Sequence, residues 1–398
     1  MSNKHFKRVL RETNRHSPFA QLASQGATSA QLKSAVVEIL SPCIDDLSLL
    51  NDLAIERLVP EAIRYLGIRN EPWSKQVFEA FQLAYHSSFS TSPSECIAIF
   101  SDWGSRISAG ESAFWSIYNL DEPKVDLPTA DNVFSTFRTI GNVLESSMKP
   151  LLQELLCHLR LASNRRPSST PVQQLDFGVV VNDIEQLLFF PEAMKPPPWN
   201  ISLSQWRNIS LHHDFNLKGE TIEVCFGPKS DRRAMEFKSD ELLLVAKKAA
   251  QVFNAISAAR AFFATNHRQQ FPLPTAEQEL RPEVQVVHLA AAISTQGFRL
   301  TDLVSSDSCI EVIIEDVVGG DHAFRMAHAS QFLYPVWSHF PKDQVKIRFL
   351  PHAKSGSVQF AVDGEICQQI SIGEIPFEVL ASSFTATASD VGDKQFEG

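Results

Sequence analysis

The fold of this chain is decided by the stretch Ser202-Leu-Ser-Gln-Trp-Arg-Asn-Ile-Ser-Leu-His-His-Asp-Phe215. Ser202 and Gln205 have the Ser-x-x-Gln spacing of a capping box, in which two side chains satisfy free backbone N–H groups at a helix start. This spacing predicts a helix that begins near Leu203 and continues to about His213.

A guanidinium, an amide and an imidazole occur together in this predicted helix, at Arg207, Asn208 and His212. Arginine stays protonated, and its planar fork matches phosphate oxygens two at a time. Histidine ordinarily titrates near neutral pH and can take or give a proton there. On an ideal helix, residues five apart differ by about 140° in azimuth and roughly 7.5 Å in rise, so the pair is loose. The residue types therefore predict contact with one phosphodiester.

The sequence on both sides of the motif predicts a helical bundle. Two amphipathic helices precede it, over residues 129–162 and 175–190, and Pro150 is positioned to divide the first. The run Lys218-Gly-Glu220 predicts a turn, and residues 221–226 and 233–237 alternate like the strands of a hairpin. A long helix follows from about residue 240 to 267, with Ser239 as its N-cap.

The motif and its frame resemble the HEPN superfamily (higher eukaryotes and prokaryotes nucleotide-binding domains). In that family a helical bundle carries an Arg-x(4–6)-His motif, and Asn often follows the Arg. Here Arg207, Asn208 and His212 match the motif, and the resemblance covers roughly residues 125–268. It implies metal-independent RNA cleavage without a cofactor, as in a bacterial toxin or an antiviral defence effector.

The resemblance also implies roles for the residues. The RNA 2′-hydroxyl would attack, His212 would act as general base or acid, and Arg207 would stabilise the transition-state charge. Asn208 would hold one of these two side chains, and single-stranded or loop RNA would be the substrate. The nearby polar residues expected to bind substrate are His213, Asp214, Arg232 and Arg233. Because the Arg–His pair is loose, a homodimer with both copies of the motif near a two-fold axis is expected.

Two other interpretations of the motif stay open. Arg207 could pair with a surface carboxylate while His212 is a half-buried structural histidine. A HEPN-fold protein could also bind RNA or a regulated protein partner without cleaving anything. The net charge of −10 favours such a scaffold, because it argues against indiscriminate coating of nucleic acid.

Composition indicates a water-soluble, cytoplasmic protein. The 398 residues are 44% hydrophobic and 21% charged, which is ordinary for globular chains, and neither a membrane span nor a signal peptide is expected. The six cysteines are far apart and form no Cys-x-x-Cys pair, so they predict reduced thiols and no metal site. The first sixteen residues carry a cluster of basic side chains that is the best candidate for an arm that contacts RNA or an acidic partner.

The predicted fold is mainly α with a C-terminal α/β domain. Residues 1–120 are expected to form a helical N-terminal region, with helices over 31–40, 47–66, 73–86 and 95–106 and a loop over 87–94. Pro60 is expected to kink or divide the second of these helices. A HEPN-like bundle with an inserted β-hairpin should follow over 125–268, then a Pro-rich linker over 271–282.

The last region, residues 283–384, predicts a small α/β domain with a repeated helix–strand–strand order. Helices are expected over 283–295 and 322–339, and strands over 298–303, 309–317, 345–350, 357–362 and 365–372. Asp363-Gly364 has the signature of a tight hairpin turn. His322, His328, His339 and His352 lack the i, i+4 spacing of a helical metal pair, so sensing, partner docking or dimerisation is the expected role. A disordered tail is expected over 385–398.

Overall fold

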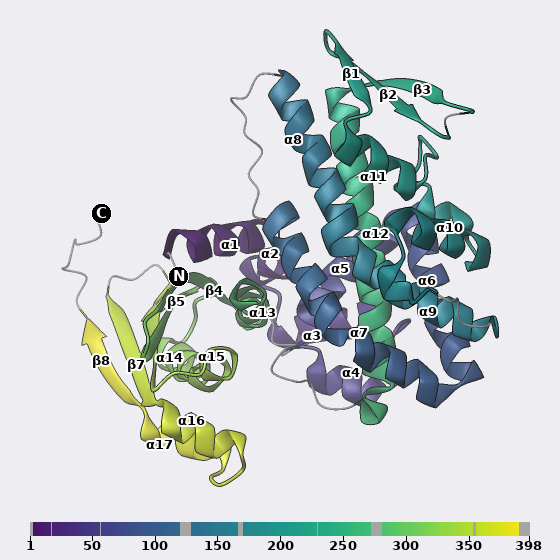
Figure 1. The fold of residues 1–398 in the computed structure, drawn as a ribbon. Coiled ribbons are helices and arrows are strands. Elements are labelled where there is room, and N and C mark those ends of the chain that lie inside the picture. The colour runs from purple at the N-terminus through teal and green to yellow at the C-terminus, as the bar shows by residue number, and fades with distance from the viewer. Residues whose placement is uncertain are drawn as a thin grey trace. The chain divides into compact units, whose positions relative to one another are not determined.

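The computed structural model shows a mostly helical protein with two small sheets (Figure 1). It describes residues 3–16, 18–55, 57–119, 129–165, 170–228, 230–271, 281–352 and 356–389. The chain forms two compact units: Met1–Ile63 with Leu280–Gly398, and Arg64–Glu279. We call them the split unit and the central unit. The expectation of a mainly α chain with β structure toward its C-terminus is therefore confirmed.

The domain boundaries differ from the expected ones. The predicted N-terminal region 1–120 is divided, because its first helices belong with the C-terminal α/β region. Helix α1 (Asn3–His16) packs on α13 (Pro282–Thr295) and on strand β4 (Phe298–Ser305). It buries Phe6, Val9 and Leu10. The split unit is thus assembled from both ends of the chain. The boundary expected within residues 120–128 and the predicted linker over 272–280 lie outside the described residues.

The split unit contains four helices before the central unit and several after it. The first group is α1, α2 (Pro18–Ser24), α3 (Ser29–Leu40) and α4 (Leu47–Leu53), followed by the start of α5 (Val59–Arg69). The expected helix over 47–66 is thus divided near Pro60, as predicted. The second group is α13, α14 (His322–Ser330), α15 (Leu333–His339), α16 (Gly364–Ser371) and α17 (Leu380–Ser383).

The sheet of the split unit has five strands in the order β4-β5-β6-β7-β8. The bounds after β4 are β5 (Cys309–Asp316), β6 (Gln344–Leu350), β7 (Ser357–Asp363) and β8 (Thr385–Ser389). All neighbouring strands are antiparallel except β5 and β6, which α14 and α15 connect in parallel. Every second residue of β5 and β6 is buried, so one face of the sheet packs against the core. The predicted helix–strand–strand repeat is present.

One predicted strand is a helix. Residues 365–372 were expected to pair through an Asp363-Gly364 hairpin, but Gly364–Ser371 forms α16. A Cβ on Gly364 would lie 2.0 Å from the backbone oxygen of Lys342, and its N–H donates to Asp343 O at 2.7 Å. Gly364 therefore serves a close backbone approach rather than a turn. On the side where this hairpin was expected, β7 pairs with β8. The tail that was expected to be disordered therefore begins as a strand, and residues 390–398 lie outside the described residues.

The central unit is a helical bundle with one small sheet. Its helices are α6 (Pro72–Thr91), α7 (Pro93–Phe114), α8 (Thr129–Asn142), α9 (Lys149–Ala162), α10 (Phe177–Leu187), α11 (Leu203–His212) and α12 (Ser239–Asn266). The prediction of a loop over residues 87–94 is wrong. Helix α6 continues to Thr91 because Phe89 packs against Phe263 and His267, and Pro93 opens α7 at once.

Pro150 does not divide the long helix before the motif. Residues Val143–Met148 widen into a π-helical segment, η2, that joins α8 to α9. Pro150 has no N–H to donate to the carbonyl four residues back. The N–H of Lys149 instead donates to Leu144 O, five residues back. The wider turn accommodates Pro150, and the helical segment continues from α8 through η2 into α9 without a break.

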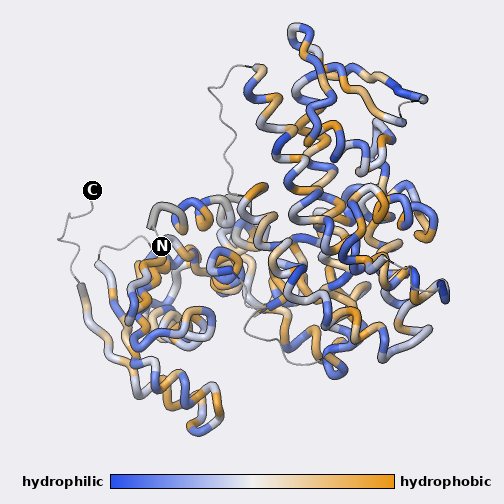
Figure 2. The backbone as a smooth tube through the Cα atoms, viewed as in Figure 1, coloured by the Kyte–Doolittle hydropathy of each residue, from blue (hydrophilic) through white to orange (hydrophobic). Residues whose placement is uncertain are grey.

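The core helix of the central unit is α12. By length and composition it is the one helix among the described residues that could cross a membrane, but 67% of its apolar window is buried inside the protein. It packs against α6 and α8, and hydrophobic positions recur along all these helices (Figure 2). This is the arrangement of a core helix in a bundle.

The expected hairpin after the motif is a three-stranded antiparallel sheet. Strands β1 (Phe215–Lys218), β2 (Thr221–Phe226) and β3 (Arg233–Lys238) pair in that order. Gly219 has a φ of 65°, a backbone conformation suited to glycine, so the predicted turn at 218–220 is confirmed. Ile222, Val224 and Phe237 are buried, which anchors the sheet to the bundle beside α11.

Candidate functional site

Helix α11 presents its apolar face inward and the motif outward. Leu203, Trp206 and Ile209 are buried, whereas Arg207 and Asn208 are partly buried and His212 is exposed. The predicted start near Leu203 is confirmed, but the capping box is wrong. Ser202 caps Ser204 N–H at 3.4 Å, and the Gln205 amide oxygen accepts instead from Gly227 N–H at 2.9 Å.

The structure brings Arg207, Asn208 and His212 together. The Arg207 Nη1 donates to Asn208 Oδ1 at 3.2 Å and lies 3.5 Å from His212 Nε2, at the limit of a hydrogen bond. The pair was expected to be loose on helical geometry alone. In the structure the two side chains nevertheless meet within one chain. The geometric reason for a composite site shared between two copies is thereby removed.

A fourth side chain, Glu145 of η2, completes this cluster. Its Oε2 accepts from Arg207 Nε at 2.9 Å and its Oε1 accepts from Lys149 Nζ at 2.7 Å. Burial by itself would raise the pKa of Glu145, but the hydrogen bonds and charges of Lys149 and Arg207 outweigh it and lower the pKa. The carboxylate is therefore ionised at neutral pH and fixes the Nε side of the guanidinium.

Sequence reasoning missed Glu145 and Lys149, which lie 62 and 58 residues before Arg207. One signal was available, because they are charged residues four apart within an otherwise uncharged stretch, and such pairs face each other on a helix. That signal does not say which other helix they meet. Isolated π-helical turns often occur at functional sites, and η2 carries Glu145.

A glycine sets the distance between α11 and the helix that leads into η2. A Cβ on Gly141 of α8 would lie 2.6 Å from Leu211 Cδ2 and 3.2 Å from Ser210 Cβ. A side chain at this position would require Leu211 and Ser210 to move, so the glycine favours close packing of the two helices. Helix α8 leads directly into η2, which carries Glu145.

The other predicted substrate-binding residues do not join this cluster. His213 has the left-handed backbone of a helix C-cap and stacks on Phe134, with ring centroids 4.7 Å apart. Asp214 pairs with Arg232 at 2.6 Å, and Arg233 pairs with Asp231 at 2.9 Å. These ion pairs are solvent-accessible, and surface pairs of this kind contribute little to stability, so a substrate-binding role for the four residues stays a prediction.

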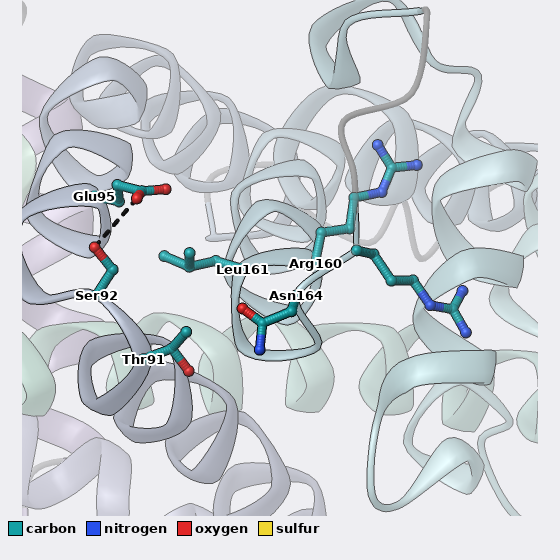
Figure 3. Close-up of a pocket in the computed structure, with 7 residues that line it drawn as sticks. Thr91, Ser92, Glu95, Arg160, Leu161 and Asn164 are labelled. Carbon is teal, nitrogen blue, oxygen red and sulfur yellow. Dashed lines mark hydrogen bonds between the residues drawn. The ribbon is translucent and has the colours of Figure 1, made fainter.

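A polar pocket of about 420 Å³ lies elsewhere in the central unit, where the end of α9 meets α6 and α7 (Figure 3). It is lined by Thr91, Ser92, Glu95, Arg160, Leu161, Asn164 and Arg165. In Figure 3 the Arg160 side chain points away from Ser92 and Glu95, and its guanidinium pairs with Asp183 at 2.7 Å. The pocket includes none of the predicted site residues, and its polar groups do not converge on one point.

A buried polar network lies between α6, α9 and α12. Arg260 Nε donates to both oxygens of Glu154 at 3.0 Å, and Tyr85 Oη donates to Glu154 at 3.4 Å. Burial raises the pKa of Glu154 to about 7, against the lowering effect of Arg260. Nearby, His158 Nδ1 lies 2.9 Å from Ser88 Oγ, and burial lowers the pKa of this imidazole to about 3. Glu154 and His158 have no exposed surface, so these two groups join the helices inside the bundle, whereas the Arg260 side chain is 21% exposed.

The four histidines of the α/β region do not form a cluster. His352 Nδ1 lies 3.2 Å from the backbone oxygen of Asp316, and His328 packs against Phe298 and Phe332. Burial, with the charges of His288 and Arg57, lowers the pKa of His339 to about 4. Among the residues that the structure describes, no three His, Cys, Asp or Glu side chains are grouped to hold a metal ion.

Comparisons with known proteins supply no relative. No protein-family model matches the chain, and neither a curated protein nor a solved structure matches it significantly. The chemistry of the Arg207 cluster must therefore be argued from its own geometry.

Proposed function

We propose that this protein is a HEPN-type, metal-independent endoribonuclease that cleaves single-stranded or loop RNA. The observation that carries the proposal is the contact of Arg207 with His212 on the outer side of α11, with Asn208 bonded to the same guanidinium. A permanent cation and a proton-transfer group within one hydrogen-bond distance can act on the same phosphodiester. The proposed biological setting is a toxin or an antiviral defence effector in the cytoplasm.

Glu145 supports the proposal by fixing one side of Arg207. Its carboxylate accepts a hydrogen bond from Arg207 Nε, and the Asn208 side-chain oxygen accepts one from Nη1. These two bonds hold the planar guanidinium, and the donors on Nη2 can bind a phosphate oxygen. A guanidinium that is already oriented loses less freedom when the charged transition state forms. We therefore assign Glu145 as a positioning residue, and Lys149 balances its charge.

The proposed step is a transesterification at phosphorus. The RNA 2′-oxygen forms a bond to the neighbouring phosphorus, and the bond from phosphorus to the 5′-oxygen breaks. His212 takes the 2′-hydroxyl proton, Arg207 stabilises the charge on the non-bridging oxygens, and the leaving 5′-oxygen takes a proton from solvent. The products are a 2′,3′-cyclic phosphate and a 5′-hydroxyl.

One observation favours the second candidate, a non-catalytic HEPN-fold protein that binds RNA or a regulated partner. Arg207 is paired with a carboxylate, which is also what a purely structural arginine would do. The net charge of −10 fits a protein-binding scaffold as well. The two candidates differ in one measurable respect, because only the nuclease needs His212 for turnover.

The deciding experiment is cleavage of end-labelled single-stranded RNA in EDTA by the full-length protein. We expect cleavage with 2′,3′-cyclic phosphate ends by the wild type, and a loss of at least about 10²-fold for His212→Ala and Arg207→Ala. The matched control is Arg299→Ala, which removes an arginine that also pairs with a carboxylate, Glu315 at 3.5 Å, but lies on β4. Binding of RNA without cleavage would instead establish the scaffold.

A further inference from the structure

Among the described residues, two of the sheet edges, β4 and β3, carry features that protect an edge strand. Edge strands with unpaired backbone groups attract other strands, and proteins protect them with charges, bulges or covering elements. Strand β4 has a register shift between Leu300 and Asp302, and α1 packs on it, with Lys7 paired to Asp302 at 3.1 Å. In the small sheet, the edge strand β3 carries Arg233, Glu236 and Lys238.

Within the part of the chain that the structure describes, strand β8 shows none of these protections. Its sequence is Thr385-Ala-Thr-Ala-Ser389, without a charge, a proline or a register shift. Among the described strands it pairs only with β7, and the side chains of residues 385–388 are exposed. It therefore offers one complete row of backbone donors and acceptors to another strand.

We propose that β8 pairs with β8 of a second copy of this chain, in antiparallel orientation about a two-fold axis at Thr387. The sequence supports this occupant because it is nearly the same read in either direction. Centred on Thr387, the pairing places threonine opposite threonine, Ala386 opposite Ala388, and Thr385 opposite Ser389. Cross-strand threonine pairs are favourable in antiparallel sheets, and no like charges meet.

The faces of the sheet stay consistent across this junction. In the β7–β8 register, Ala386 lies opposite the buried Phe360, so the exposed alanines share the side of the sheet on which Phe360 lies. Thr385 and Thr387 lie opposite Ala361 and Gln359 and continue the partly exposed side. An isologous pair therefore extends one sheet to ten strands without moving a polar residue into the core.

The segment between β7 and β8 also carries exposed apolar side chains. Ile372 and Phe377 are 63% and 45% exposed, and they follow α16, which packs on β7. In Figure 1 this segment lies at the end of the sheet where β7 and β8 meet α16 and α17. Apolar side chains beside an open sheet edge fit a protein partner rather than solvent.

The test is sedimentation equilibrium of the full-length chain from about 1 to 100 µM, a range that covers weak specific pairing. We expect a reversible dimer for the wild type and for the control Thr387→Val, which keeps a β-branched side chain. Thr387→Lys and Thr387→Glu each place like charges opposite each other at the axis, so each should be monomeric. An equimolar mixture of these two variants should dimerise again, which also shows that both are folded.

Three outcomes would overturn the proposal: a monomeric wild type over the whole range, a Thr387→Lys variant that dimerises like the wild type, or a mixture that stays monomeric. Neither Arg207 nor His212 takes part in this contact. The result is therefore independent of the nuclease assay.

Discussion

At the scale of single residues, Arg207 is the centre of the proposed site. Three side chains surround its guanidinium: Glu145 at Nε, and Asn208 and His212 at Nη1. A lysine has three donors, but all on one nitrogen and without the planar fork that meets these partners from separate nitrogens. We expect Arg207→Lys to cleave RNA roughly 10²-fold more slowly than the wild type, close to Arg207→Ala, in single-turnover assays.

The positioning role of Glu145 predicts a difference between two substitutions. Glu145→Gln keeps an oxygen that accepts from Arg207 Nε, so cleavage should stay within about threefold of the wild type. Glu145→Ala removes that oxygen and frees the guanidinium, which should lower kcat by about 10-fold with little change in KM. Equal losses for the two variants, with matching losses of stability, would show that Glu145 acts only in folding.

The buried network makes a prediction about pH and stability. Glu154 has a pKa of about 7 in the folded chain, above its ordinary value, so it keeps its proton while the unfolded chain loses one. Its contribution to the free energy of unfolding therefore falls as the pH rises between about 4.5 and 7. His158 has a pKa of about 3, below its ordinary value, so its contribution rises with pH between about 3 and 6.5. Between about 4.5 and 6.5 the two effects oppose each other.

Substitution should separate these opposing effects. Relative to the wild type, Glu154→Gln should make the free energy of unfolding increase more steeply with pH, by up to about 1.4 kcal/mol per pH unit. His158→Asn should change the slope by a similar amount in the opposite direction. Urea titrations at several pH values between 4.5 and 6.5 measure both slopes. Parallel profiles for all three proteins would contradict the shifted pKa values.

At the scale of elements, the site depends on how closely α8 and α11 approach. An alanine at Gly141 would place its Cβ 2.6 Å from Leu211 Cδ2 and 3.2 Å from Ser210 Cβ, so these parts of α11 must move to make room. We expect Gly141→Ala to lower RNA cleavage by about 10-fold or more, because displacements of about 1 Å near a site are costly. The matched control is Gly67→Ala in α5, where a Cβ meets nothing within 4 Å and alanine favours the helix. If both variants cleave like the wild type, the close approach does not position the site.

At the scale of the whole molecule, we expect a truncated fragment to fold only if it contains a whole compact unit, and one of the two units combines both ends of the chain. A fragment of residues 57–279 holds the central unit and starts before α5, so we expect it to be soluble and helical. A fragment of residues 1–272 keeps α1 but loses α13 and β4, which cover Phe6, Val9 and Leu10. We expect it to aggregate, because it exposes a helix face made to be buried. Soluble expression and circular dichroism of both fragments test this, and a soluble, monomeric 1–272 would contradict it.

Elements with local signals could be predicted from the sequence. The helices at 29–40 and 203–212, the division near Pro60, the turn at Gly219 and most strands follow from periodicity, proline and glycine. The candidate site could be predicted for the same reason. Arg207, Asn208 and His212 lie close together on one helix, and the chemistry of their side chains can be recognised without knowing which other segment they contact.

Features that depend on contacts between distant segments could be seen only in the three-dimensional structure. Glu145 meets Arg207 across 62 residues, α1 completes the α/β region from the other end of the chain, and Gly364 begins a helix because Lys342 lies against it. In each case the local sequence permits several structures, and packing energy from a remote partner selects one. Periodicity reports which face of an element is apolar but not which element will cover it.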